Sequence, residues 1–248
     1  MGTVSKLEEF VAQDCPIRLA EEGIYSVLSN GPHSHQYDKE AAIYDFLVGT
    51  RLYNKVMWGQ FPEEYAVFAH KADTSEPEGP ILDAGCGSLL FTARSHIGCG
   101  RLVIACDRSI GMLRRARARV ARLDSRRVEN ILFLQADLSE MPFREAVFRT
   151  VLCMNVLHHY QDGPGLMTQI KRSLVNGGQL YLTSLVLNNR PIGDKYLGLL
   201  HKRKWIARPR SREELKEILD KTSSGKIDLK TMGNMAYAIV ACGETEGA

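Results

Sequence analysis

Two glycines spaced by one residue follow an aspartate at the end of a short apolar run near residue 80. The run is Ile81-Leu82-Asp83-Ala84, and the chain continues Gly85-Cys86-Gly87-Ser88. Glycine allows a sharp backbone turn and lets a ligand approach the backbone without a Cβ in the way. Ligands of open α/β sheets bind beyond the carboxyl ends of the strands, where such a loop lies. The pattern therefore predicts a ligand-binding turn after a strand.

Two further aspartates follow apolar runs. Asp107 comes directly after the run 101–106, and Asp137 comes shortly after the run 131–135. The first can accept both hydroxyls of a ribose, and the second can accept a hydrogen bond from an adenine amino group. Together with Asp83 they suit a nucleoside that carries an ammonium group. A dinucleotide fits poorly, since Leu90 breaks the pattern G-x-G-x-x-G. The alternative is that Asp107 and Asp137 only cap helices.

The elements that must position these residues are strands and helices from residue 80 onward. Apolar runs separated by helical candidates predict a parallel sheet with helices on both faces. The clearest helix is 110–123, and Ser211 is predicted to cap a later one. Residues 226–232 and 235–242 predict an antiparallel hairpin through Gly233-Asn234. The fold class is therefore α/β, a Rossmann-like seven-stranded sheet, mostly parallel. Its other strand runs are 80–84, 101–106, 131–135, 150–154 and 179–187.

Two segments fall outside the strand-and-helix pattern. Residues 1–79 are predicted to form a mainly helical N-terminal cap or lid that ends in a polar linker. The core, 80–248, carries an insertion at 188–210 with a cluster of basic residues. We expect both segments to form a lid over the substrate. The basic cluster could recognise an acidic group or an anionic membrane surface, but a solvated loop and helix is the favoured interpretation.

Five stretches give the chain a family resemblance. LDAGCGS, VIACDRSIGML, QADLSEMPF, VLCMNVLHH and LVNGGQLYLTS occur in the order and spacing of class I S-adenosylmethionine-dependent methyltransferases. Residues 80–242 resemble their small-molecule group, which includes ubiquinone/menaquinone-type enzymes (methyltransferase type 11-like). IYDFLVGTRLYNKVMWG looks like the Tyr-Asp helix that covers the cofactor in that group. The resemblance implies S-adenosylmethionine as cofactor and S-adenosylhomocysteine as product.

The resemblance also implies roles for individual residues. Asp83, Gly85 and Gly87 would hold the methionine part of the cofactor. Asp107 would bind the ribose, while Met112, Asp137 and Leu138 would meet the adenine. Asn155 would contact the cofactor from below, and Tyr44 would close over it. Two positions depart from the family pattern: Leu89 replaces a third glycine, and Arg149 replaces an aspartate before the fourth strand.

His158 and His159 follow the fourth strand, where acceptors sit in this fold. A histidine with an ordinary pKa of about 6.5 can act as a general base for an acidic hydroxyl or carbon acid. The alternative is that one ring packs under the sheet while the other bonds a backbone carbonyl. This pair is the candidate catalytic site, and no metal is expected.

Composition narrows the class of protein. The formal net charge of +3 is too small to imply a polyanionic partner. Six cysteines without a C-x-x-C pair indicate neither a zinc site nor disulfides, which favours the cytoplasm. We find neither a secretory signal nor an apolar run that approaches the ~18 residues of a membrane span. The arginines of 110–123 are interpreted as a solvated helix face, so no nucleic acid is expected as a partner.

The sequence thus predicts a methyltransferase that acts on oxygen or carbon of a small-molecule acceptor. Two alternatives stay open: a non-catalytic or partner-dependent protein of this fold, which Leu89 favours, and an RNA or protein methyltransferase. Enzymes that methylate amino groups of nucleic acids carry Asn/Asp-Pro-Pro-Tyr/Phe after the fourth strand. The residues here are Asn155-Val156-Leu157-His158.

Overall fold

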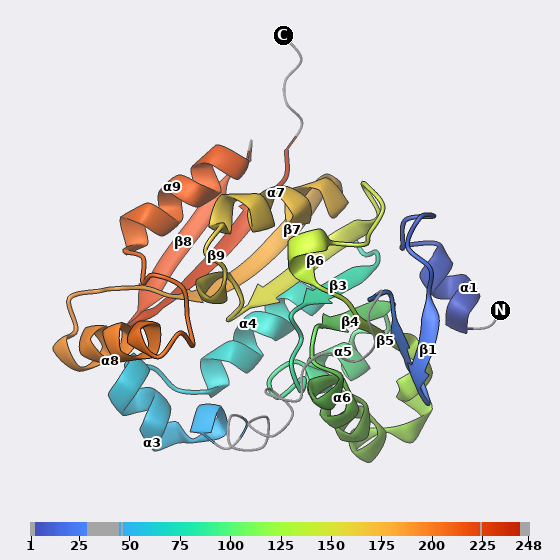
Figure 1. The fold of residues 1–248 in the computed structure, drawn as a ribbon, viewed down its shortest axis with the longest axis horizontal. Coiled ribbons are helices and arrows are strands. Elements are labelled where there is room, and N and C mark those ends of the chain that lie inside the picture. The colour runs from blue at the N-terminus through green and yellow to red at the C-terminus, as the bar shows by residue number, and fades with distance from the viewer. Residues whose placement is uncertain (1–2, 29–44, 46, 224, 244–248) are drawn as a thin grey trace, which may run out of the picture.

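A mixed sheet runs through the whole molecule (Figure 1). The computed structural model describes residues 3–28, 45, 47–223 and 225–243, and within them the sheet has nine strands in the order β1-β2-β5-β4-β3-β6-β7-β9-β8. The strands are β1 Arg18–Glu21, β2 Ile24–Ser26, β3 Ile81–Ala84, β4 Val103–Asp107, β5 Ile131–Gln135, β6 Phe148–Met154, β7 Leu174–Leu185, β8 Ile227–Met232 and β9 Met235–Ala241.

The strand directions confirm the predicted α/β fold. Neighbouring strands from β2 to β7 are parallel, whereas β9 pairs antiparallel with both β7 and β8. The carboxyl ends of β3, β4 and β5 therefore lie along one edge of the sheet. Because β8 runs in the same direction as β7, the turn of the C-terminal hairpin lies at that edge as well.

The predicted number of seven strands is wrong, because two more strands lie in the segment expected to be mainly helical. β1 and β2 form a hairpin around Gly23, whose φ of 71° is a conformation that favours glycine. β2 then adds in parallel to β5, with Ile24 opposite Phe133. Ile24 is buried in this position, so the pairing both covers the edge of β5 and buries an apolar side chain.

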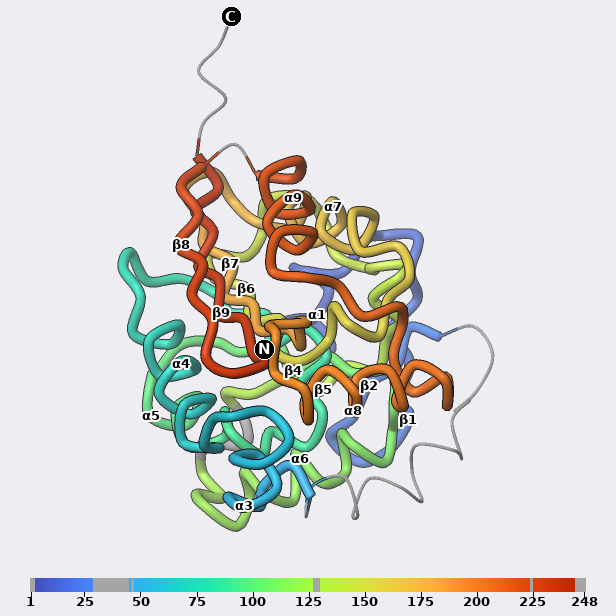
Figure 2. Tube along the Cα trace, turned by 90° about the vertical axis from the view of Figure 1, so that its left-hand side faces the viewer, coloured from blue at the N-terminus to red at the C-terminus, as the bar shows by residue number. Residues whose placement is uncertain are grey.

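Helices cover both faces of the sheet, as predicted. Alternate residues of the central strands enter two apolar clusters: Leu82 and Ile104 belong to one, Ile81 and Val103 to the other. Helices α1, α7 and α9 supply the first cluster, and α4, α5, α6 and α8 supply the second. Helices α7 and α9 lie side by side in both views (Figures 1 and 2). The bounds of the helices are α1 Thr3–Glu8, α3 Arg51–Tyr53, α4 Glu63–Asp73, α5 Ala93–Gly98, α6 Ile110–Leu123, α7 Gly163–Ser173, α8 Pro191–Lys202 and α9 Arg212–Thr222.

The structure confirms two helix starts that the sequence predicts. Helix α6 has the predicted bounds, and Ser109 caps it by accepting the amide of Met112. Ser211 caps α9 through a full capping box with Glu214. Among the described residues, none of the helices has the length and apolar character that crossing a bilayer requires. The shorter turns are η1 Asn54–Trp58, η2 Ser125–Asn130, η3 Leu138–Glu140 and η4 Leu157–His159.

Asn234, in the turn between β8 and β9, joins three distant segments. It is fully buried, and its amide donates to the carbonyl of Trp58 in η1 at 2.8 Å. Its side-chain Nδ2 donates to Asp194 of α8 at 2.6 Å, and its Oδ1 accepts from Arg190 at 2.9 Å. The hairpin turn, η1 and the start of α8 are therefore fixed together at the carboxyl edge of the sheet.

We expect Asn234→Ala to lower the free energy of unfolding by about 2–4 kcal/mol, because it leaves buried polar partners without hydrogen bonds. Urea unfolding of the two proteins measures the difference. Gln161→Ala, at an exposed position, should cost less than about 0.5 kcal/mol. Equal effects of the two substitutions would contradict the anchoring role of Asn234.

Candidate functional site

The glycine loop leaves the carboxyl end of β3 and is tied to β4. The amides of Gly85 and Cys86 both donate to the carbonyl of Cys106, at 2.8 and 2.9 Å. Both glycines have positive φ, 75° at Gly85 and 53° at Gly87. A Cβ on Gly85 would collide with Val156, whereas no described atom lies within 4 Å of a Cβ placed on Gly87. Gly85 thus serves the turn and its packing, and Gly87 leaves backbone open to a ligand.

Asp107 is held against this loop, as the sequence pattern requires. Its Oδ2 accepts the amide of Gly87 at 2.9 Å, and its Oδ1 accepts the amide of Ser109 at 2.8 Å. Burial raises the pKa of Asp107, while these two hydrogen bonds act against the rise. The carboxylate therefore links the glycine loop to the start of α6.

Asp137 lies at the next strand end, where it also caps a short helix. Its Oδ1 accepts from both the amide and the hydroxyl of Ser139, at 2.9 and 2.7 Å. Arg108, in the loop after β4, lies 3.3 Å from its Oδ2. Leu138 and Met112 are buried next to these loops. Asp137 therefore caps a short helix, as the alternative interpretation held. Its contact with adenine stays a prediction.

Asn155 follows β6 with a φ of 59°, which is unusual for a residue other than glycine. Its amide donates to the carbonyl of Thr183 at 3.0 Å, and its Oδ1 accepts from the Thr183 hydroxyl at 3.1 Å. These contacts with β7 direct the chain so that Val156 packs on Gly85. The loops after β3 and β6 are consequently in contact. Tyr44, predicted to close over the cofactor, lies outside the described residues.

The two histidines after β6 differ in their surroundings. His158 is buried, and its Nδ1 accepts the amide of Leu185 at 3.3 Å. Burial, together with His159 and Arg210, lowers its pKa well below the ordinary value. His158 is therefore neutral, with its one proton on Nε2, and fits the packing alternative.

His159 is exposed, and its Nδ1 lies 2.9 Å from the carbonyl of Trp205. Since a carbonyl only accepts, Nδ1 carries the proton and Nε2 keeps a lone pair. The rings of His158 and His159 lie 4.4 Å apart. The bond of His159 to a backbone carbonyl is the second half of the structural alternative, and its catalytic role stays a prediction.

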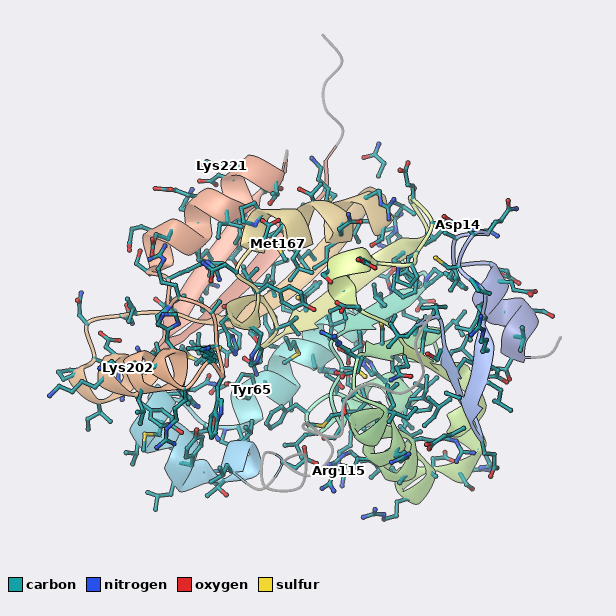
Figure 3. All side chains as sticks on the ribbon, viewed as in Figure 1. Asp14, Tyr65, Arg115, Met167, Lys202 and Lys221 are labelled. Atoms are coloured by element: carbon teal, nitrogen blue, oxygen red, sulfur yellow. The ribbon has the colours of Figure 1, made fainter. Side chains whose placement is uncertain are left out.

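Two arginines of the basic insertion make hydrogen bonds or ion pairs within the chain. Arg210 donates to the carbonyls of Tyr160 and Gln161, at 2.7 and 3.0 Å, and Arg208 pairs with Glu214 at 2.6 Å. Lys202, in contrast, is exposed at the end of α8 (Figure 3). The insertion thus braces the loop that carries the histidines through Arg210, and most of its other cations are exposed.

Sequence reasoning missed Asp45, which connects the glycine loop to α6. The hydroxyl of Ser88 donates to its Oδ1 at 2.6 Å, and Arg119 donates to its Oδ2 at 2.9 Å. Arg115 lies 3.3 Å from the same oxygen. Arg114 and Arg117 pair with Glu21 and Glu22. These arginines stay on a partly solvated face, as predicted, but acidic residues of the N-terminal segment also pair with them there.

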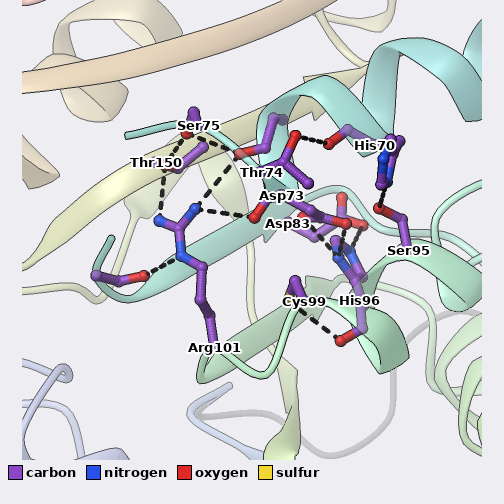
Figure 4. Close-up of polar contacts among 12 residues, drawn as sticks. His70, Asp73, Thr74, Ser75, Asp83, Ser95, His96, Cys99, Arg101 and Thr150 are labelled. Carbon is purple, nitrogen blue, oxygen red and sulfur yellow. Dashed lines mark hydrogen bonds and ion pairs between the residues drawn. The ribbon is translucent and has the colours of Figure 1, made fainter. Parts of the chain in front are cut away.

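A buried cluster of Asp73, His96 and Asp83 lies behind the loop (Figure 4). Nε2 of His96 is 2.9 Å from Oδ2 of Asp83, and Nδ1 lies within 3.0 Å of both oxygens of Asp73. Burial lowers the pKa of His96, but the two carboxylates outweigh it and raise that pKa to about 10. The sequence offered no signal for this cluster, because its residues come from α4, β3 and α5.

The two departures from the family pattern have different consequences. Leu89 adopts a φ of 54°, so it takes the left-handed conformation that a glycine would take, and its side chain is buried in the second apolar cluster. Arg149 lies near the amino end of β6, away from the glycine loop, and donates to the carbonyl of Asn176 at 3.1 Å. Only Leu89 therefore bears on the site.

At Leu89 we expect an inverted order of stability: Leu89→Gly should be more stable than Leu89→Ala by about 1 kcal/mol, because glycine adopts positive φ without strain. Both variants lose the buried side chain and fall below the wild type by about 2–5 kcal/mol. Leu113, buried in the middle of α6, is the matched control, where alanine should be the better residue. Urea unfolding checks both pairs, and the same order at both sites would contradict the argument.

The charge on His96 predicts a pH dependence. Because its pKa is about 10 in the folded chain against an ordinary 6.5, its stabilising contribution is complete below pH 6.5 and is lost as the pH rises toward 10. We expect the difference in unfolding free energy between wild type and His96→Gln to shrink from pH 8 to 10, by at most about 1.4 kcal/mol per pH unit. A difference that is constant over this range would contradict the charged state.

Comparisons with known proteins agree with this geometry. Residues 82–182 match a family described as a methyltransferase domain. The tRNA U34 carboxymethyltransferase of Psychromonas ingrahamii is 32% identical over 107 residues, which are 43% of this chain and 32% of that protein. The 27-O-demethylrifamycin SV methyltransferase of Amycolatopsis mediterranei is 30% identical over 113 residues, 46% of this chain and 41% of that one. The chain thus spans less than half the length of the curated relatives it matches.

A solved structure extends the likeness of fold beyond the matched residues. Phosphoethanolamine N-methyltransferase 2 of Haemonchus contortus, in complex with S-adenosyl-L-methionine, superposes with a TM-score of 0.65 at 16% identity, over 85% of this chain and 58% of that one. At this identity the similarity concerns the fold. Residues 82–182 therefore match a methyltransferase domain, and the chain shares the fold of a methyltransferase whose structure holds S-adenosyl-L-methionine.

Proposed function

We propose that the chain is a methyltransferase that uses S-adenosylmethionine and methylates oxygen or carbon of a small molecule. The observation that carries this proposal is the glycine loop bonded to Asp107, with open space at Gly87, at the carboxyl edge of a parallel sheet. Such an edge is where open α/β sheets bind ligands. The matched methyltransferase domain includes this loop.

The residues of the edge fit the cofactor. A carboxylate has about four acceptor positions, and described amides use two of those on Asp107, so it retains capacity for ribose hydroxyls. Met112 and Leu138 provide apolar surface beside Asp137 for an adenine. Asp83, Gly85, Gly87 and Asn155 would meet the methionine part. When bound, the cofactor supplies an activated methyl group on a sulfonium.

The work left to the protein is to orient the acceptor, exclude water and take a proton. Alignment of two reactants can contribute about 7–11 kcal/mol. His159, with a lone pair on Nε2, would receive the proton of an acidic hydroxyl or carbon acid. His158 would hold the loop through Leu185.

The cap and the insertion would cover the acceptor from two sides. They are packed on each other: the hydroxyls of Tyr53 and Tyr196 lie 3.1 Å apart, and the rings of Trp58 and Tyr196 lie 5.4 Å apart. Asn234 fixes both to the hairpin turn. An acceptor bound beside these aromatic side chains would meet apolar surface, which suits a small apolar molecule.

The arginines of α6 favour a small molecule over tRNA. One curated relative is named for a rifamycin and another for tRNA, so the names leave both acceptors open. Four arginines of α6 are paired with acidic residues of the N-terminal segment, which reduces the positive charge that this helix offers to phosphates. We also propose that the chain is cytoplasmic. Its six cysteines are all free thiols, which is typical of proteins in a reducing compartment.

Binding of S-adenosylhomocysteine tests the proposal. Calorimetry should show binding to the wild type, and ligand at 100 times its Kd should stabilise the fold by about 2.7 kcal/mol. Asp107→Asn should weaken binding about tenfold by removing acceptor capacity toward the ribose. Asp220→Ala, on the exposed face of α9, is the control and should bind like the wild type. A wild type that does not respond to millimolar ligand would refute the proposed function.

A further inference from the structure

The proposed function uses Asp83 but neither of its buried partners, His96 and Asp73. The side chains of His96 and Asp73 are 0% exposed, and that of Asp83 is 2% exposed. Both ring nitrogens of His96 face carboxylates at hydrogen-bond distance. A carboxylate cannot donate unless it is protonated, so each of the two contacts requires a proton.

The number of protons fixes the charge of the cluster. Two protons shared by one imidazole and two carboxylates leave one negative charge, wherever each proton resides. Burying two carboxylates without this compensation would be costly, because charges leave water only when paired and hydrogen-bonded. His96 thus permits Asp83, the acidic residue of the glycine loop, to be buried beside the site together with Asp73.

Arg101 and Cys99 contact the backbone that carries Asp73 and His96 (Figure 4). Arg101 donates to the carbonyls of Ala72 and Asp73 at 3.4 and 3.3 Å, and so fixes the end of α4. Cys99 donates to the carbonyl of His96 at 3.3 Å. The titratable or charged groups around His96 are Asp73 and His70 of α4, Asp83 of β3, Cys99 after α5, and Arg101 before β4.

The bonds on the two carboxylates are unequal. Both oxygens of Asp73 lie within reach of Nδ1, whereas only Oδ2 of Asp83 lies within hydrogen-bond distance of Nε2. His96 thus holds one oxygen of the Asp83 carboxylate, and Oδ1 stays outside this contact. Asp83 is followed after one residue by Gly85, where the open loop begins.

We propose that His96 is a positioning residue that orients the buried carboxylate of Asp83 to receive the α-ammonium group of the cofactor through its other oxygen. This proposal rests on the proposed function. His96 touches neither cofactor nor acceptor; it acts through Asp83, and Asp73 acts through His96. The cluster supplies a single negative charge that is aimed at the amino-acid end of the ligand and contributes nothing to the adenosine end.

Two ligands separate this role from a structural one. S-adenosylhomocysteine carries the α-ammonium, whereas 5′-methylthioadenosine has the same adenosine and thioether without the amino-acid part. Their Kd values are measured by calorimetry on the wild type and on His96→Gln. We expect His96→Gln to weaken S-adenosylhomocysteine about tenfold or more and to change 5′-methylthioadenosine less than about twofold. His70→Gln, at an exposed position on α4, is the matched control and should leave both Kd values unchanged.

Asp73→Asn gives a second test if His96→Gln fails to fold. It keeps the shape of the cluster and removes its negative charge, so it should weaken S-adenosylhomocysteine several-fold and spare 5′-methylthioadenosine. Equal losses for the two ligands, or no loss in a folded variant, would overturn the positioning role while the proposed function stands. A wild type that binds neither ligand would instead refute the proposed function.

Discussion

Three hydrogen bonds between the loop after β3 and the end of β4 determine the geometry of the site. The amides of Gly85 and Cys86 converge on one carbonyl of β4, and the amide of Gly87 takes the carboxylate of Asp107. To make these bonds the chain turns back over a very short distance, which requires positive φ at Gly85 and Gly87 and again at Leu89. Two of these positions carry glycine. At Leu89 the strained backbone is offset by burial of the side chain.

Buried charge couples this loop to the layers around it. The cluster around His96 links α4 and α5 to Asp83, and Arg101 links the end of α4 to the β6 side chain of Thr150 at 2.9 Å. Asp45 makes a second link, because it joins the N-terminal segment both to Ser88 of the glycine loop and to Arg119 of α6. The loop is thus held from the core by one set of ion pairs and from the outer segment by another. A structural change in α4 or in the N-terminal segment consequently reaches the loop directly.

Sequence alone predicted those features that depend on local pattern. Helix α6 follows from helical spacing, and the start of α9 follows from Ser211 at the N-cap. Strands β3 to β9 follow from apolar runs and turn residues. The hairpin of β1 and β2 was missed because its strands have four and three residues, and the residues of β1 are mostly exposed, so no alternating pattern exists. Asp45 and His96 were missed since their partners lie 43 and 13 residues away from them or farther.

The difference between local patterns and contacts of distant residues also explains why the acceptor is harder to infer from the sequence than the cofactor. The residues proposed for the cofactor stand at the ends of successive strands, where the motif and the topology place them together. The acceptor side that we propose is assembled from η1, the loop after β6, α8 and the hairpin turn. These segments meet through Asn234 and through the contact of Trp205 with His159. None of these contacts is local in sequence. The family match, over 82–182, omits η1, α8 and the hairpin turn. The relatives named for tRNA and for a rifamycin match 43% and 46% of this chain, so they can share the domain and differ in acceptor.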